Sequence, residues 1–168
     1  MKEWTDSLSV TSKVRRVGWV GLICNLLLAA AKAAAGIIGH SQAVLADALH
    51  SLTDSVTDIA VILGVKFWTA PADEDHPHGH GRVETLVTVF IGLAVGAVAV
   101  GMGVEAIRGL KHEPEVAPSG IALIVSLLSM VVKEALYRWS ARVGREVGSP
   151  ALEANAWHHR SDAISSIP

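Results

Sequence analysis

Apolar residues fill long stretches of the chain, and short polar segments separate these stretches. Neither 17–31 nor 86–104 contains a charged residue, which is typical of helices that cross a bilayer in roughly 20 residues. The pattern predicts membrane helices at about 17–38, 44–68, 83–107 and 121–139, and a fifth that starts near Ala151. We therefore predict an all-α membrane protein, a transmembrane helix bundle.

The predicted connections are short. A tight turn at 39–43 makes the first two helices a hairpin. The segments 69–82 and 108–118 are rich in proline, glycine and polar residues, and both are predicted to be loops. In the third helix, glycines are expected to let neighbouring helices of the bundle pack closely, and a specific dimer face is the alternative; these are Gly92, Gly96, Gly101 and Gly103.

The composition agrees with a membrane protein. Of the 168 residues, 51% are hydrophobic and only 18% are charged, a balance too apolar for an ordinary soluble domain. The net charge of -2 and the absence of a long basic run exclude nucleic acid as an expected partner. The single cysteine, Cys24, lies in the first apolar segment and cannot form an intrachain disulfide.

Lysine and arginine are distributed unequally between the two ends of the bundle. The N-terminal tail, 1–16, carries four of them, and the second and fourth connections with the adjoining helix ends carry five more. The opposite side has only Arg108 and Lys111. This asymmetry predicts a multi-pass protein of the cell (inner) membrane with a cytoplasmic N-terminus.

One nine-residue pattern occurs twice, at 46–54 and at 154–162, and each copy contains His-x-x-x-Asp. Residues four apart share one face of a helix, so each copy offers an imidazole and a carboxylate to the same point. A structural hydrogen-bonding network is the alternative for a single pair, but such a network does not need two matched pairs. Two imidazoles and two carboxylates suit Zn²⁺. The predicted ligands are His50, Asp54, His158 and Asp162.

Other ionisable residues lie near these ligands. In the second helix, Asp47, His50, Asp54 and Asp58 form one stripe about 80° wide. An ionised Asp near the bilayer centre costs about 2.5–3.5 kcal/mol, so this stripe is expected to face protein, water or a cation. Asp47 and Asn155 each precede a predicted histidine ligand by three residues, and we interpret them as partners that orient the imidazoles. An ordinary hydrogen bond between helices is the alternative for both. Asp58 approaches the cytoplasmic end, where a solvated entrance residue is expected.

Two further charged residues are candidates for supporting roles. Lys32 in the first helix is expected to form a structural ion pair with an acid rather than to contact the substrate. Glu134 in the fourth helix is a candidate for the proton path if it faces the bundle.

The loop at 71–81 has three acids and three histidines within eight residues, next to two glycines. A solvated polar turn is one interpretation. The other is a second, more exposed metal site or an entry funnel on the cytoplasmic side.

At these motifs the sequence resembles the cation diffusion facilitator (cation efflux) family of divalent-metal transporters. The resemblance covers nearly the whole chain, including the loop with Arg82 and Glu84 and the run from Lys133 to Arg138. It implies that the four residues above form the transport site, and that Asp73, His76 and His80 form a loop metal site. Family members are typically homodimers that export Zn²⁺ and related ions by alternating access, usually in exchange for protons.

The resemblance also sets expectations for the domains. Family members have six membrane helices and a cytoplasmic domain, so 17–168 is expected to hold about five of the six, with the fifth truncated and the cytoplasmic domain absent. Manganese carriers favour all-acidic ligand sets, so two histidines and two aspartates favour zinc. Cobalt, cadmium, ferrous iron and manganese remain open. The metal is expected as substrate, with no cofactor.

Two alternatives to a transporter were considered. An intramembrane metalloenzyme needs a general base beside a metal-bound water, and the chain lacks the His-Glu-x-x-His arrangement that would supply it. We therefore expect no enzyme. A metal-binding or sensing subunit without transport is harder to separate from a carrier by sequence.

Overall fold

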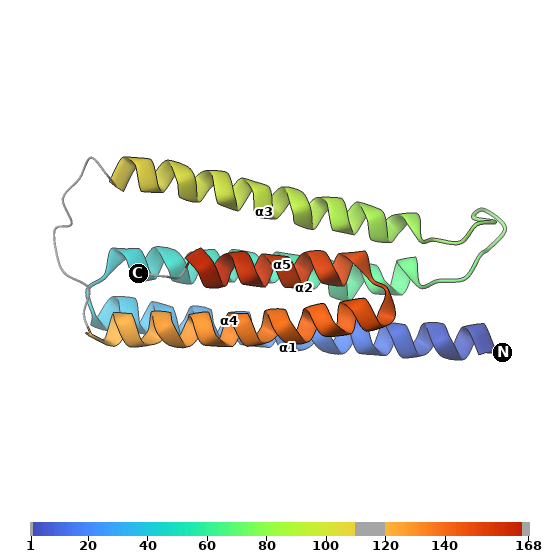
Figure 1. Cartoon of the computed structure of the whole chain (residues 1–168), viewed down its shortest axis with the longest axis horizontal. Helices are drawn as coiled ribbons and strands as arrows, with labels where there is room; N and C mark the ends of the chain where they lie inside the picture. Colours follow the sequence, from blue (N-terminus) through green and yellow to red (C-terminus); the bar gives the residue numbers. More distant parts are fainter. Residues whose placement is uncertain (1, 110–119, 166–168) are drawn as a thin grey trace.

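The computed structural model describes residues 2–109 and 120–165, and these residues form five α-helices (Figure 1). They are α1 (Lys2–Ile38), α2 (Gln42–Trp68), α3 (Arg82–Gly109), α4 (Gly120–Val147) and α5 (Pro150–Ser165). The predicted all-α fold and the number of helices are confirmed. Most of the loop predicted at 108–118 lies outside the described residues.

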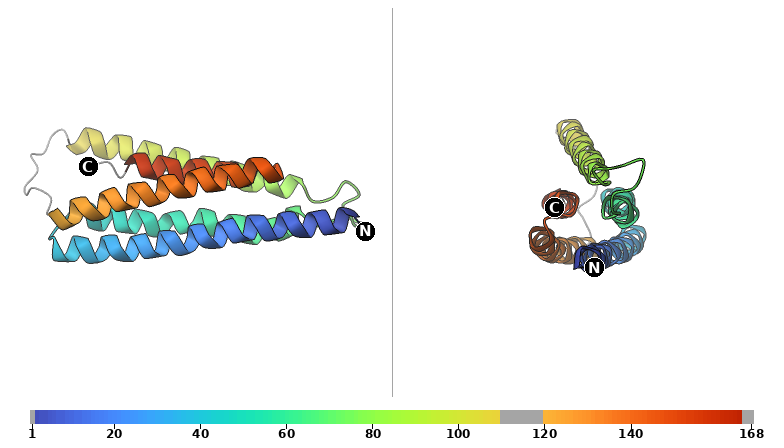
Figure 2. Two further views of the ribbon diagram at one scale, coloured as in Figure 1. Left: turned by 60° about the horizontal axis from the view of Figure 1, so that its bottom comes forward. Right: turned by 90° about the vertical axis from the view of Figure 1, so that its right-hand side faces the viewer.

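The five helices run side by side along the bundle. Viewed along the bundle, α1 and α4 lie on one side, α2 and α5 lie next to them, and α3 covers α2 and α5 from the other side (Figure 2). The N-terminus of α1, the loop between α2 and α3 and the turn between α4 and α5 are all at one end of the bundle (Figure 1). Residues from α2, α4 and α5 can therefore meet in the middle.

Two helix boundaries differ from the sequence prediction. α1 begins at Lys2 rather than near Val17, and α4 continues to Val147 instead of ending at Trp139. Apolar periodicity marks the part of a helix that lies in lipid, whereas a helix can extend into water as a polar segment. An ion pair between Lys13 and Glu146 joins these two extensions outside the apolar region.

The turn between α4 and α5 has strong local signals. Gly148 has a positive φ of 66°, which a residue without a side chain adopts at little cost. The amide of Ser149 then bonds to the carbonyl of Gly144 at 3.0 Å, a pattern that closes helix C-termini. The Ser149 hydroxyl accepts from the amide of Leu152 and Pro150 begins α5, so the next helix starts at once.

The bundle is polar inside and apolar outside. Lys32, Asp58 and Lys133 are completely buried, whereas Leu27, Leu49 and Leu93 are 66–70% exposed. This is the polarity expected of a protein in lipid. Three described helical segments are long and apolar enough to cross a membrane, namely Ser9–Ile38, Val44–Trp68 and Arg82–Gly101. That α4 and α5 also cross remains a prediction.

An apolar cluster fills the bundle near the end that holds the N-terminus. It includes Val14, Val61, Val65, Trp68 and Leu152, contributed by α1, α2 and α5. We call it the apolar seal. Toward the opposite end, the described residues form a smaller cluster of Ala35 and Val44, with Val125 packed against it. The two ends of the bundle are therefore packed differently.

Glycines of α1 lie close against α2, whereas four glycines of α3 pack against no neighbour. A Cβ on Gly36 would lie 2.8 Å from Cγ and 3.0 Å from the backbone nitrogen of Leu45. By contrast, a Cβ on Gly92, Gly96, Gly101 or Gly103 would meet nothing within 4 Å. The prediction of close packing in this bundle at the α3 glycines is wrong, because their surface faces away from the other described helices.

This contrast predicts that replacing glycine by alanine has opposite effects on stability at Gly36 and at Gly92. Gly36→Ala should destabilise the protein by about 1–2 kcal/mol, because the backbone of Leu45 must shift to make room. Gly92→Ala should be neutral or stabilise by about 0.5–1 kcal/mol, because alanine is the better helix former. Thermal melting of the two variants in the same detergent tests this. Equal melting temperatures would contradict the close approach of α1 and α2.

Candidate metal centre

The two His-x-x-x-Asp pairs meet in the middle of the bundle, where α2 faces α5. His50 Nε2 lies 3.7 Å from Asp54 Oδ1 and 3.8 Å from Asp162 Oδ1. On the other side, His158 Nε2 lies 3.4 Å from Asp54 Oδ1, and His158 Nδ1 lies 3.8 Å from Asp162 Oδ1. The structure thus brings together all four residues that the sequence pattern selected.

Three of the four residues, His50, Asp54 and Asp162, are close enough to share a single metal ion, and His158 lies beside them. Zinc bonds of about 2.0–2.1 Å at the tetrahedral angle place neighbouring ligand atoms about 3.3–3.4 Å apart. Potential ligand atoms of His50, Asp54 and Asp162 all lie within 4.8 Å of one another. Moreover, the ring atoms His50 Nε2 and His158 Nε2 are buried without a hydrogen-bond partner. Buried polar atoms are seldom left without a partner, and a metal ion would satisfy both.

A fifth side chain completes this centre. Lys133, from α4, places its ammonium 2.7 Å from Asp54 Oδ2 and 2.8 Å from Asp162 Oδ2. The lysine is completely buried, and both carboxylates are almost so. The carboxylates therefore divide their oxygens, with Oδ2 facing the lysine and Oδ1 facing the imidazoles.

The sequence pattern did not indicate Lys133 as part of the centre, and the adjacent Glu134 was the candidate for the proton path. In the structure, Glu134 accepts a hydrogen bond from Arg138 Nε at 2.7 Å on the outer side of α4. That assignment is wrong because residues adjacent in a helix are about 100° apart, so only one of the two can face the interior. The signal for Lys133 was present as an ionisable residue within an apolar helix.

One turn further along α2, Asp58 belongs to a separate buried network. Asn25 and Asn155 donate side-chain hydrogen bonds to its two carboxylate oxygens, at 2.8 and 2.7 Å. His159 Nε2 lies 3.4 Å from the same carboxylate. Two predictions are therefore wrong. Asp58 is completely buried and is not a solvated entrance residue, and the Asn155 amide donates to Asp58 instead of orienting His158.

The network was not predictable from spacing within one helix. Asn25, Asn155 and Asp58 come from three helices, and only their packing brings them together. Gly21 makes room for it, because a Cβ there would lie 2.8 Å from Asp58 Oδ1.

Lys32 forms the structural ion pair that was expected. Its ammonium lies 2.9 Å from Asp47 Oδ2 and donates to the hydroxyl of Ser51 at 3.0 Å. Asp47 was interpreted as the residue that orients His50. In the structure its described partner is Lys32, because α1 packs closely enough on α2 to bring this lysine to it.

The loop between α2 and α3 gathers the second set of predicted ligands. Asp73 lies 3.1 Å from His76 Nδ1 and 3.4 Å from His80 Nε2. Potential ligand atoms of all three residues lie within 4.8 Å of one another. Gly79 has a φ of 74°, which lets the chain turn and return His80 to Asp73.

The loop also favours the charged form of the Asp73 carboxylate. Desolvation raises the pKa of Asp73, but hydrogen bonds from the backbone N–H and ring of His76, with the charges of His76 and His80, outweigh it. The pKa of Asp73 therefore lies below its ordinary value, and the group remains an anion that can attract a cation.

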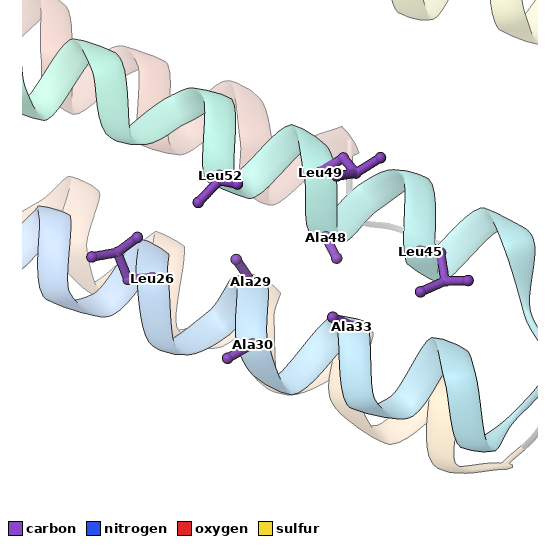
Figure 3. A pocket seen from close by; sticks show the side chains of 8 residues that line it. All are labelled: Leu26, Ala29, Ala30, Ala33, Leu45, Ala48, Leu49 and Leu52. Atoms are coloured by element: carbon purple, nitrogen blue, oxygen red, sulfur yellow. The ribbon is translucent and has the colours of Figure 1, made fainter.

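The surface groove between α1 and α2 has a different character. It has a volume of about 520 Å³ and is lined only by alanines and leucines, with Ala29, Ala33 and Ala48 between the two helices (Figure 3). It offers no side-chain ligand for an ion.

The fold and the centre together define a multi-pass membrane protein with a charged cluster in the interior of its helix bundle. Residues 18–167 match the model of the cation efflux transmembrane domain. The chain therefore belongs to the cation efflux family, whose members are transporters and not enzymes.

Several relatives are about two fifths identical to this chain over the aligned residues. An uncharacterized transporter of Methanocaldococcus jannaschii is 40% identical over 88% of the chain and 52% of the relative. The manganese efflux system protein MneP of Bacillus subtilis is 39% identical over 91% and 51%. The magnetosome protein MamM of Paramagnetospirillum magneticum is 37% identical over 90% and 48%. The chain spans about half the length of these relatives.

The loop cluster leads to a prediction about metal binding. His76→Ala and His80→Ala should each weaken Zn²⁺ binding at the loop by about tenfold or more, because each removes one of three ligands. His78→Ala is the matched control, since this neighbouring histidine is exposed and is not in the cluster. Calorimetric titration with Zn²⁺ in an Asp54→Ala background isolates the loop. Equal weakening in all three variants would show that the loop binds metal only through its general charge.

Proposed function

We propose that the protein exports a divalent metal cation, Zn²⁺, by alternating access. The proposal rests on the cluster of His50, Asp54 and Asp162, whose potential ligand atoms lie within 4.8 Å of one another, with His158 next to it, inside the bundle of a cation efflux family member. The residues proposed as transport ligands are His50, Asp54, His158 and Asp162. Membership of the family supports metal transport, while the particular ion is inferred from the ligand chemistry.

Zinc is the ion that best suits this chemistry. Zn²⁺ accepts four nitrogen and oxygen ligands in a tetrahedral arrangement, whereas Mn²⁺ favours oxygen ligands and six-fold coordination. Since one relative is named for manganese efflux, Mn²⁺ is the competing ion against which zinc must be tested.

The packing of the two bundle ends supports alternating access. The side chain of His50 is 26% exposed, while those of Asp54, His158 and Asp162 are at most 2% exposed. His50 lies on the side of the centre nearer the α1–α2 turn, and the apolar seal closes the other side. We infer that the structure is open toward the α1–α2 turn. Transport would then require the bundle to close at this end and to open at the end that the apolar seal now closes.

The remaining features of the proposal come from charge and from the family. Imidazoles and carboxylates bind protons as well as metal, which supports exchange of the ion for protons. The lysine and arginine distribution supports a cytoplasmic N-terminus in an inner membrane. We further propose that the protein works as a homodimer.

Ion flux tests the transport ligands. In liposomes containing the protein, Asp54→Ala and Asp162→Ala should each lower Zn²⁺ uptake by about a hundredfold or more, because each removes a charged ligand. Asp75→Ala is the control, since it removes an exposed acid of the loop that lies outside both clusters. Uptake that persists in both ligand variants would refute the transport site. A protein that binds Zn²⁺ at this site without any uptake would instead be a binding or sensing subunit.

A pH gradient tests the exchange for protons. An acidic vesicle lumen should accelerate Zn²⁺ uptake several-fold, because outward proton movement would drive the ion inward in a coupled exchanger. Collapse of the gradient with a protonophore should remove the acceleration. A rate that does not respond to the gradient would show transport without proton coupling.

A further inference from the structure

Lys133 contacts the two carboxylates in a way that limits what they can offer to an ion. Its ammonium lies 2.7 Å from Asp54 Oδ2 and 2.8 Å from Asp162 Oδ2. The imidazole nitrogens approach the other oxygen, Oδ1, of both residues. Each aspartate therefore has one oxygen facing the ligand centre and one occupied by the lysine.

The number of free oxygens matters for the choice of ion. A carboxylate with both oxygens free can bind an ion through two atoms, and larger oxygen-preferring ions such as Mn²⁺ use this to reach six ligands. A carboxylate limited to one oxygen contributes a single ligand. Two such carboxylates and two imidazoles make four ligands, the number that Zn²⁺ prefers.

Lys133 has few other places in the bundle where its charge would have an acidic partner. Its side chain is completely buried, and the two aspartates are the acids within ion-pair distance of it among the described residues. Moving the ammonium away would leave a buried charge without a partner, which is strongly unfavourable. The lysine is therefore expected to stay on the Oδ2 atoms while an ion binds on the Oδ1 side.

We propose that Lys133 determines the ion preference of the centre by holding Oδ2 of both Asp54 and Asp162. The inference rests on the proposed transport site. It makes the lysine a positioning residue that never contacts the ion itself. Because the ammonium also repels any cation on the Oδ1 side, it lowers affinity for every divalent ion while it disfavours Mn²⁺ most.

Lys133→Met tests the proposal, since methionine has a similar length and no charge. Binding of Zn²⁺ and of Mn²⁺ is measured separately, in a His76→Ala, His80→Ala background that removes the loop cluster. Both affinities should rise, and the ratio of Mn²⁺ to Zn²⁺ affinity should increase by about tenfold. A purely structural lysine would lower both affinities in parallel and leave the ratio unchanged.

Two further variants complete the experiment. Lys32→Met is the matched control, because Lys32 is equally buried but pairs with Asp47, outside the ligand set, so the ratio should stay at the wild-type value. Lys133→Arg keeps the positive charge and can hold both carboxylates, so it should preserve zinc preference. If Lys133→Met fails to fold, the arginine variant still tests the proposal. A strong increase in the ratio of Mn²⁺ to Zn²⁺ affinity in Lys133→Arg would overturn it.

The outcomes separate this inference from the proposed function. If Asp54→Ala binds Zn²⁺ as well as the wild type in the same background, the transport site itself is refuted. If Asp54→Ala loses binding but the ratio in Lys133→Met equals that of the wild type, only the role of Lys133 is refuted. An equal change of the ratio in Lys32→Met would also refute it, because the effect would then come from any buried positive charge.

Discussion

The structure depends on charge compensation of two buried carboxylates, those of Asp54 and Asp162, in the interior of the bundle. An isolated charge in such a place is very costly, so the surrounding helices must bring positive groups to it. α4 brings Lys133, while α2 and α5 bring the imidazoles. The same constraint explains the rest of the buried polar interior, where Lys32 pairs with Asp47 and two amides hold Asp58. Charge compensation thus contributes to how α1, α2, α4 and α5 pack.

This compensation is also what makes exchange of an ion feasible. The two aspartates and Lys133 carry a net charge of about -1, so the centre attracts a cation without holding the full charge of two unpaired acids. A centre that attracts its ion moderately can also release it. The apolar seal then matters as much as the ligands, because it fills the bundle between the centre and the end that holds the N-terminus.

The surface of the bundle has the apolar character expected of a protein in lipid. Large apolar side chains of α2 and α3 are exposed on the outside of the bundle, and the glycines of α3 face away from the other described helices. Small residues on α1 instead face α2, where Gly36 and Gly21 allow the close approach that places Lys32 and Asn25 beside α2. Close packing is concentrated where polar groups must meet.

The sequence by itself determined the helices and the ligand candidates. Long apolar stretches can only be helices in lipid, and residues four apart must share a helix face, so both His-x-x-x-Asp pairs were predictable. The loop ligands followed from the family resemblance. Only the tertiary structure decided which polar residues are partners. Lys133 rather than Glu134 faces the carboxylates, Asn155 holds Asp58 instead of His158, and Asp47 meets Lys32. The physical reason is that contacts within a helix follow from spacing, whereas contacts between helices depend on their rotation and depth, which periodicity leaves open.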